Sequence, residues 1–305
     1  MLFPPPLRPG DTIGIFSPAG PVRDPKKVDK SLCLLREAGF EVVTGTRTGC
    51  DVEYLAASDE QRAAELTELW NDPTIHALIA VRGGYGCLRM MDRLDWNLAA
   101  RHPKLLIGFS DLTALLNTLY ARSGLISVHG PVLSTLSTSS EQTRRHFLAL
   151  LSGEIPIYEL GRQINIQRPG KAQGPVLGGN LTTLVHLLAT PWDFSWDGAI
   201  LVLEDTGEEL YRIDRMLTQL QLAGKFERLN GLILGDFDRA GRGNPVSDRE
   251  LALAVSRRVL ELTTHLDFPI WQSFPVGHGA DNLPFFIGMN GFMDSSNIIF
   301  GYNKA

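Results

Sequence analysis

Short apolar runs alternate with segments of helical periodicity along the first half of the chain. The runs are typical of buried strands and cover residues 11–16, 40–43, 76–82, 105–107 and 125–129. Between them, apolar residues recur three or four positions apart, as in Val28, Leu32 and Leu35, which is typical of helices packed on one face. This alternation predicts an α/β fold, a doubly wound parallel sheet with helices on both faces.

The second half of the chain has a different pattern. Glycine-rich segments separate apolar strands at residues 198–204 and 229–235, and helices are predicted over 211–223 and 247–262. A chain of 305 residues is long for a single hydrophobic core. Residues 154–172 lack helical periodicity and are predicted to be a linker. We therefore expect two domains, residues 1–153 and 173–305.

Ser110 stands where an apolar strand gives way to a helix. Leu105, Leu106 and Ile107 form the strand, and Gly108 marks a turn. Ligands of parallel sheets bind at the carboxyl ends of the strands, so this hydroxyl would lie at the binding edge beside a helix N-terminus. Nucleophiles of the α/β-hydrolase type occupy such a position, although the GxSxG sequence is not matched. The alternative is that Ser110 only caps the helix.

Glu204 and His278 are the other residues in positions suited to chemistry. Glu204 ends the apolar run Ile200–Leu203, where an acid can orient a histidine; its alternative role is to cap the next turn. The neighbouring acids Asp205, Glu208 and Glu209 weaken the signal. His278 lies between glycines that let the backbone approach a ligand closely, and its alternative is a loop histidine bonded to backbone.

The glycine-rich segment Arg82-Gly83-Gly84-Tyr85-Gly86 follows a predicted strand and opens a helix. Its N–H groups are suited to an anion or oxyanion, although a plain tight turn fits these residues equally well. The segment matches neither the P-loop nor the complete dinucleotide fingerprint, which disfavours an NAD-dependent enzyme. No HExxH motif or paired Cys/His spacing indicates a metal site, and we expect no cofactor.

The bulk composition restricts the class of protein. A net charge of −5 argues against a nucleic-acid partner. The three cysteines, Cys33, Cys50 and Cys87, form no CxxC motif and suit a reducing compartment. The first residues lack the pattern of a signal peptide, and no apolar run approaches the roughly 20 residues of a membrane helix. We therefore expect a cytoplasmic protein without a membrane partner.

Several motifs occur together in a fixed order along the chain. They are Ser17-Pro-Ala-Gly, Asp59-Glu-Gln-Arg-Ala-Ala, Arg82-Gly-Gly-Tyr-Gly, Gly-Phe-Ser110-Asp, His129-Gly-Pro, Leu-Glu204-Asp-Thr-Gly-Glu, Tyr211-Arg-Ile-Asp-Arg-Met-Leu and Pro-Val-Gly-His278-Gly. Over nearly its whole length the chain resembles the LD-carboxypeptidase (muramoyltetrapeptide carboxypeptidase) family of serine peptidases, which includes microcin C immunity peptidases.

The resemblance implies a Ser–His–Glu triad assembled across the two domains. Ser110 would be the nucleophile, His278 the general base and Glu204 the residue that orients it. The backbone N–H groups of Gly84 and Asp111 would form the oxyanion hole.

The resemblance also implies a smaller, β-rich C-terminal domain, a homodimer and no metal. The substrate would be a cytoplasmic murein tetrapeptide, cleaved before its terminal D-alanine during cell-wall recycling. Arg82, Gly83 and Tyr85 are candidate substrate-binding residues. Arg239 and Arg242 are further candidates for the substrate carboxylate, with a solvated surface loop as their alternative role.

Two other functions remain compatible with these motifs. An immunity-type peptidase would use the same triad to hydrolyse a microcin C-like peptidyl- or aminoacyl-adenylate in a different pocket. A non-catalytic module that binds murein peptides is the second alternative, although the intact triad residues argue against it.

Overall fold

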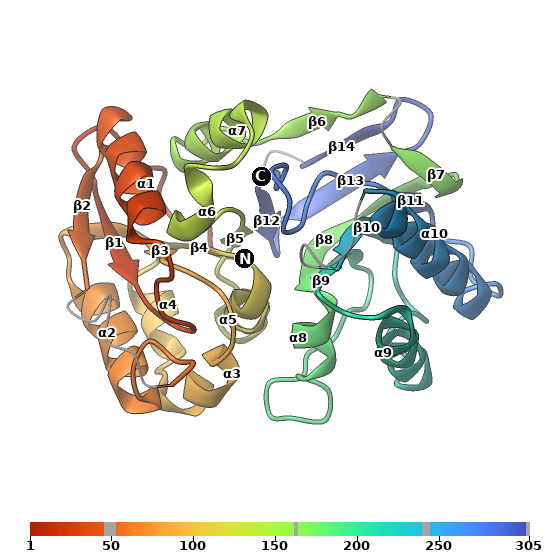
Figure 1. The fold of residues 1–305 in the computed structure, drawn as a ribbon, viewed down its shortest axis with the longest axis horizontal. Coiled ribbons are helices and arrows are strands. Elements are labelled where there is room, and N and C mark those ends of the chain that lie inside the picture. The colour runs from red at the N-terminus through yellow and green to blue at the C-terminus, as the bar shows by residue number, and fades with distance from the viewer. Residues whose placement is uncertain (46–52, 162–163, 240–244, 303–305) are drawn as a thin grey trace. The chain divides into compact units, whose positions relative to one another are not determined.

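The chain folds into two compact units (Figure 1). The computed structural model describes residues 1–45, 53–161, 164–239 and 245–302. The first unit consists of Met1–Glu154 and Asn282–Gly288, and the second of Ile155–Asp281 and Met289–Ala305. Each unit contains its own sheet, and the chain passes from one unit to the other three times.

The sheet of the first unit has the strand order β12-β5-β4-β3-β1-β2. Five strands are parallel, and β12 pairs antiparallel with β5 at the edge. The strands are β1 (Thr12–Phe16), β2 (Glu41–Thr44), β3 (Ile75–Ala80), β4 (Leu105–Gly108), β5 (Ser127–His129) and β12 (Phe285–Ile287). Because β1, β3, β4 and β5 are parallel, the segments that follow them meet at one edge of the sheet.

Helices cover both faces of this sheet (Figure 1). α1 packs with α6 on one face, and α2, α4 and α5 pack together on the other. The helices are α1 (Pro25–Glu37), α2 (Asp59–Asn71), α3 (Cys87–Met90), α4 (Asn97–Arg101), α5 (Thr113–Ser123), α6 (Leu133–Leu136) and α7 (Glu141–Leu151). α2 begins with a capping box formed by Ser58 and Gln61. The predicted doubly wound α/β fold is confirmed for this unit.

The sheet of the second unit is mixed, with the order β6-β14-β13-β8-β9-β10-β11-β7. Its four central strands, β8 to β11, are parallel, and antiparallel strands flank them on both sides. The strands are β6 (Ile157–Glu159), β7 (Asn165–Arg168), β8 (Lys171–Asn180), β9 (Ile200–Thr206), β10 (Gly231–Asp238), β11 (Ile270–Gln272), β13 (Asn290–Asp294) and β14 (Ile299–Tyr302). The helices are α8 (Leu181–Val185), α9 (Leu210–Leu222) and α10 (Pro245–Leu262).

Residues 154–172 are not a linker, and that prediction is wrong. Within this segment β6 pairs with β14, β7 pairs with β11, and β8 begins at Lys171. The two short strands lie at opposite edges of the sheet. Their partners come from residues more than a hundred positions further along the chain, so periodicity within the segment could not show the pairing.

The first unit also contains a segment from near the end of the chain. β12 supplies Phe285, whose side chain is fully buried and whose ring stacks on His129 at 4.5 Å between centroids. Gly288 ends this segment with φ of +89°, and a Cβ there would lie 2.1 Å from Tyr120 Cδ2. The return of the chain to complete the first sheet was not anticipated from the sequence.

In the part of the chain that the structure describes, no helix has both the length and the apolar character needed to cross a membrane. Cys33 and Cys87 are free thiols, the first exposed and the second buried. Cys50 lies outside the described residues.

We expect Phe285→Ala to lower the free energy of unfolding by about 3–5 kcal/mol, because it leaves a cavity where a buried ring packed. Urea unfolding followed by circular dichroism measures the change. Leu222→Ala is the matched control, because the Leu222 side chain is 78% exposed and its loss removes little buried area. Equal stabilities of the two variants would contradict the assignment of β12 to the first core.

Candidate active site

Ser110 adopts a backbone conformation that few serines show. It follows β4 with φ of +63°, in the left-handed region, and begins a short 3₁₀ helix over Ser110–Leu112 that leads into α5. A non-glycine residue in this region costs of order 1–3 kcal/mol, and such residues are concentrated at functional sites. The Ser110 side chain caps neither the 3₁₀ helix nor α5, so the alternative of a simple N-cap is wrong.

The glycine-rich segment after β3 lies against Ser110. A Cβ built at Gly83 would be 2.9 Å from Ser110 Cβ and 3.2 Å from Ser110 Oγ. Gly84 follows with φ of +122° and packs against Gly20 of the loop after β1. The structure therefore brings Ser110, Gly83, Gly84 and Asp111 together at the carboxyl edge of the first sheet.

Arg82 and Tyr85 flank these glycines in different environments. The half-buried Arg82 donates from Nη1 to the carbonyl oxygen of Pro21 at 2.8 Å, which ties two loops together. Burial, assisted by the charge of Arg23, lowers the pKa of Arg82 below its ordinary value. Tyr85 is 52% exposed, and its ring lies 5.7 Å from that of Tyr54.

The second unit brings Glu204 and His278 together. Glu204 lies near the end of β9 with no exposed surface, and its Oε2 is 2.8 Å from Nδ1 of His278. The His278 side chain is 21% exposed. Burial lowers the pKa of His278, but the charge and hydrogen bond of Glu204, together with the charges of Asp238 and Asp205, outweigh it, so the net shift is upward. With the Nδ1 hydrogen donated to Glu204, Nε2 is the basic nitrogen of the neutral ring.

The loop that carries His278 rests directly on β10. The Asp236 N–H donates to the carbonyl oxygen of Val276 at 2.8 Å. Gly235 leaves the space for this approach, since a Cβ there would lie 2.4 Å from Val276 O. Gly277 has φ of +151°, and a Cβ on it would lie 2.7 Å from Asp236 Cβ. These contacts place His278 beside the end of the neighbouring strand, β9.

Carboxylates that the sequence reasoning did not select surround this pair. Burial, with the charges of Asp238 and Glu204, raises the pKa of Asp236 to about 7. Burial, with the charge of Glu204, raises the pKa of Asp205 to about 6, although Asp205 accepts hydrogen bonds from Asn180 and Thr182. Asp236 and Asp238 follow a buried apolar run as Glu204 does, and that shared position was the signal available in the sequence.

Arg239 directly follows β10, and its backbone N–H donates to Asp248 Oδ1 at 3.3 Å. Arg242 lies outside the described residues. Within the described ranges, no group of three or more His, Cys, Asp or Glu residues could hold a metal ion.

Two domain families have sequence patterns that match this chain, and together they cover most of it. The LD-carboxypeptidase N-terminal domain matches residues 13–130, which include Ser110 and the glycine-rich segment. The LD-carboxypeptidase C-terminal domain matches residues 173–291, which include Glu204 and His278. The chain belongs to the LD-carboxypeptidase family.

Relatives of named function support this membership of the LD-carboxypeptidases. A probable murein peptide carboxypeptidase of Bacillus subtilis is 34% identical over 95% of this chain and 91% of that protein. A murein tetrapeptide carboxypeptidase of Pseudomonas aeruginosa is 32% identical over 94% of each chain. The resemblance inferred from the motifs is thus confirmed, and the chain is a hydrolase of the serine carboxypeptidase type.

The microcin C7 self-immunity protein MccF of Escherichia coli is 30% identical over 96% of this chain and 93% of its own length. A solved structure of MccF in its apo state superposes with a TM-score of 0.89 and 27% identity, covering 100% of this chain and 99% of the other. The α/β fold expected from the resemblance is confirmed.

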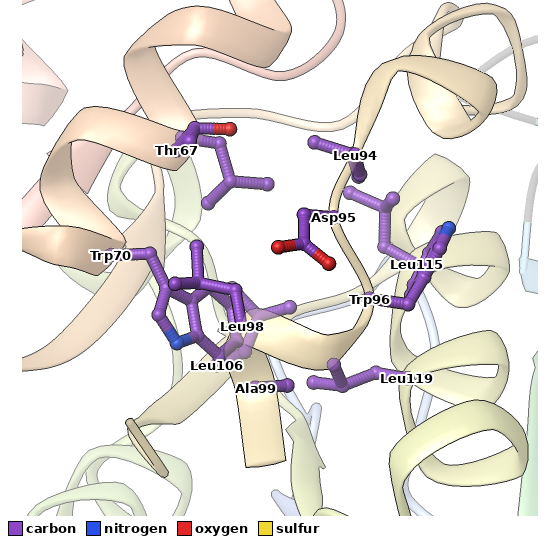
Figure 2. Close-up of a pocket in the computed structure, with 11 residues that line it drawn as sticks. Thr67, Trp70, Leu94, Asp95, Trp96, Leu98, Ala99, Leu106, Leu115 and Leu119 are labelled. Carbon is purple, nitrogen blue, oxygen red and sulfur yellow. The ribbon is translucent and has the colours of Figure 1, made fainter. Parts of the chain in front are cut away.

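The structure has two hollows of interest, and only one of them borders an expected site residue. One in the second unit has a volume of about 930 Å³, and Asp236, Asp238, Asp248, Arg249 and His278 are among the residues that border it. The other lies between α2, α4, α5 and β4 of the first unit, measures about 30 Å³ and has mainly apolar walls, among them Trp70, Leu98 and Leu115 (Figure 2). The second has room for about one water molecule and contains none of the expected site residues.

We expect Gly83→Ala to lower kcat by about a hundredfold, because the added methyl group displaces Ser110 or the glycine-rich segment by a fraction of an ångström to an ångström. Steady-state kinetics on a carboxypeptidase substrate measures the change. Gly10→Ala is the control. A methyl group there has no heavy atom within 4 Å, although Gly10 has φ of +91° and Ala is strained in that conformation. Equal kcat for the two variants would show that the tight contact at Gly83 has no bearing on catalysis.

Proposed function

We propose that this chain removes the terminal D-alanine from murein tetrapeptides, with Ser110 as nucleophile, His278 as general base and Glu204 as the residue that orients His278. The observation that carries the proposal is the 2.8 Å hydrogen bond between the fully buried Glu204 and His278. A carboxylate removed from water and bonded to one imidazole nitrogen is the arrangement that fixes the tautomer of a catalytic base.

In the proposed reaction, Ser110 Oγ attacks the carbonyl carbon that precedes the terminal alanine, and its proton passes to His278 Nε2. The N–H groups of Gly84 and Asp111 stabilise the resulting oxyanion. The tetrahedral intermediate then collapses, the C–N bond breaks, and His278 returns the proton to the amine of D-alanine. Water, activated by His278, hydrolyses the acyl-enzyme and restores Ser110. Glu204 remains ionised and stabilises the imidazolium that forms twice in each cycle.

Three further observations support this assignment of roles. The strained backbone of Ser110 is typical of a nucleophile displayed between a strand and a helix. The contact between Gly83 and Ser110 keeps backbone N–H groups near the reacting serine. The proposal requires the two units to bring Ser110 Oγ and His278 Nε2 within hydrogen-bonding distance during turnover.

The substrate is proposed from the relatives, two of which are named for murein peptides. Arg82, Gly83 and Tyr85 remain the proposed substrate-binding residues of the first unit. In the second unit, the hollow of about 930 Å³ beside His278 is large enough for a peptide side chain and its neighbours.

The setting of the reaction is part of the proposal. A cytoplasmic location fits a chain with three cysteines and no CxxC motif, because such a compartment keeps thiols reduced. We propose a homodimer with no nucleic-acid or membrane partner and no metal cofactor. Light scattering during gel filtration measures the mass of the assembly.

The decisive experiment is incubation with L-Ala–γ-D-Glu–meso-diaminopimelate–D-Ala, followed by mass analysis. We expect loss of one alanine with the wild-type protein, and no turnover above background with a folded Ser110→Ala variant, because the nucleophile is absent. A parallel incubation with an aminoacyl-sulfamoyl adenosine tests the immunity-type activity. Cleavage of that compound alone, or undiminished activity of the serine variant, would reject the proposal.

The acid limb of the pH profile should report the protonation of His278. The base must be neutral to accept the serine proton, so kcat/KM should fall as the pH drops through an apparent pKa above the ordinary imidazole value of about 6.5. In Glu204→Gln the charge that raises this pKa is removed, so the limb should move to lower pH while the maximal rate falls. Glu209→Gln, at an exposed acid nearby in the sequence, should keep the wild-type profile. An unmoved limb in Glu204→Gln would exclude Glu204 as the partner of the base.

A further inference from the structure

The backbone conformation of the segment Gly83–Gly86 is not determined by the segment alone. Gly84 and Gly86 have φ of +122° and +131°, and glycine loses more conformational freedom on folding than any other residue. An oxyanion donor acts only if it is held in place before the charge develops. If Gly84 supplies such a donor, contacts from outside the segment must hold it.

One contact comes from the residue that follows the proposed nucleophile. Asp111 is 8% exposed, and its Oδ2 accepts a hydrogen bond from the N–H of Cys87 at 2.8 Å. A hydrogen bond to an ionised acceptor is about twice as strong as one between neutral groups. The Asp111 side chain thus connects the turn that carries Ser110 to the end of the glycine-rich segment. From the sequence, Asp111 was expected to contribute only its backbone N–H to the site, not its side chain.

A second contact holds the peptide group between Gly86 and Cys87 from its carbonyl side. Arg62, on α2, has no exposed side-chain surface and donates from Nη1 to the carbonyl oxygen of Gly86 at 2.9 Å. It also donates to the carbonyl oxygens of Ala57 and Pro18, and forms an ion pair with Asp59. Ala57 lies just before α2 and Asp59 begins it, and Pro18 lies in the loop after β1. Because its partners lie in two separate segments, the guanidinium is itself held in one position.

The carbonyl group of Gly86 and the N–H group of Cys87 belong to one planar peptide unit. Arg62 holds its oxygen and Asp111 holds its hydrogen. A rotation of this plane would break both hydrogen bonds and leave buried polar groups unpaired, which is costly. At the other end of the segment, the N–H of Gly20 donates to the carbonyl oxygen of Gly83 at 3.2 Å.

We propose that the side chain of Asp111, acting with Arg62 on the Gly86–Cys87 peptide, is a positioning element that sets the separation of the two oxyanion donors. One donor is the N–H of Asp111 itself, and the other is on the segment that its carboxylate holds. This inference rests on the proposed function, because it assigns a role in the same acyl-transfer reaction. It adds a role for two side chains that touch neither the substrate nor the reacting atoms.

The test compares Asp111→Ala with Asp111→Asn, which keeps an acceptor oxygen of the same shape. We expect Asp111→Ala to lower kcat for the tetrapeptide by about a hundredfold, the effect of losing one oxyanion donor, with KM within about twofold of wild type. Asp111→Asn should recover kcat to within about tenfold of wild type. In the Ser110→Ala background, adding Asp111→Ala should change the calorimetric Kd for the tetrapeptide by no more than about twofold, because the oxyanion forms only during reaction.

Ser140→Ala is the matched control. Ser140 caps α7 of the same unit by accepting a hydrogen bond from the Thr143 N–H at 3.2 Å, so its loss also removes one bond from a side chain to a backbone N–H. Ser140→Ala should lower Tm by about 2–4 °C and leave kcat unchanged. Should Asp111→Ala not fold, Asp111→Leu takes its place, since it has a similar shape and no acceptor.

Three outcomes would overturn the inference. They are a kcat for Asp111→Ala equal to that of Ser140→Ala, a weakened Kd that accounts for the whole loss, or an Asp111→Asn variant as slow as Asp111→Ala. Each is measured relative to wild-type turnover. Absence of turnover by the wild-type protein would instead reject the proposed function, so the two failures are distinguishable.

Discussion

In the proposed mechanism, the chemistry of this protein depends on the hydrogen bond between Glu204 and His278. Moving a carboxylate out of water costs several kcal/mol, and the imidazole offsets that cost when it donates a hydrogen bond and carries part of the positive charge. The pKa values of Asp205 and Asp236 are raised first by burial and then by the charges of neighbouring carboxylates, Glu204 among them. Buried groups with shifted pKa values are concentrated at functional sites, and this cluster supports the catalytic role proposed for Glu204 and His278.

In both units, neighbouring parallel strands bring the candidate site residues together at one edge of the sheet. In the first, β3 and β4 end side by side, so the glycine-rich segment and Ser110 meet at one edge. In the second, β9 and β10 end side by side, so Glu204 meets the loop that rests on β10. Residues far apart in the sequence thus need only short connections to approach one another, and the rigid strands fix their positions.

The sequence was sufficient wherever the signal was local. The apolar runs predicted the parallel strands of the first sheet, and β9 and β10 of the second. The positions of Ser110, Glu204 and His278 at strand ends or glycine turns identified them as candidates before their surroundings were known. What could not be predicted depends on distant partners. β6, β7 and β12 are short strands whose pairing is set by tertiary contacts.

The same limit applies to the side chains around the candidate site. Asp111 could be read from sequence as a helix-terminal acid, yet its carboxylate bonds to a residue 24 positions earlier. Arg62 lies on a helix whose pattern predicts only one buried face, and nothing local shows that a guanidinium is enclosed there. Hydrogen bonds between residues far apart in the sequence produce no periodic pattern, because each one involves a single pair of residues.

The return of β12 to the first sheet affects how the protein is made. During synthesis on the ribosome, β5 remains an unpaired edge until residue 287 has emerged, because its neighbour on that side comes from Phe285–Ile287. The sheet that carries the serine is therefore finished only after most of the second unit has been translated. Nascent chains would have to keep that edge from pairing with other molecules in the meantime, because an exposed strand edge promotes aggregation.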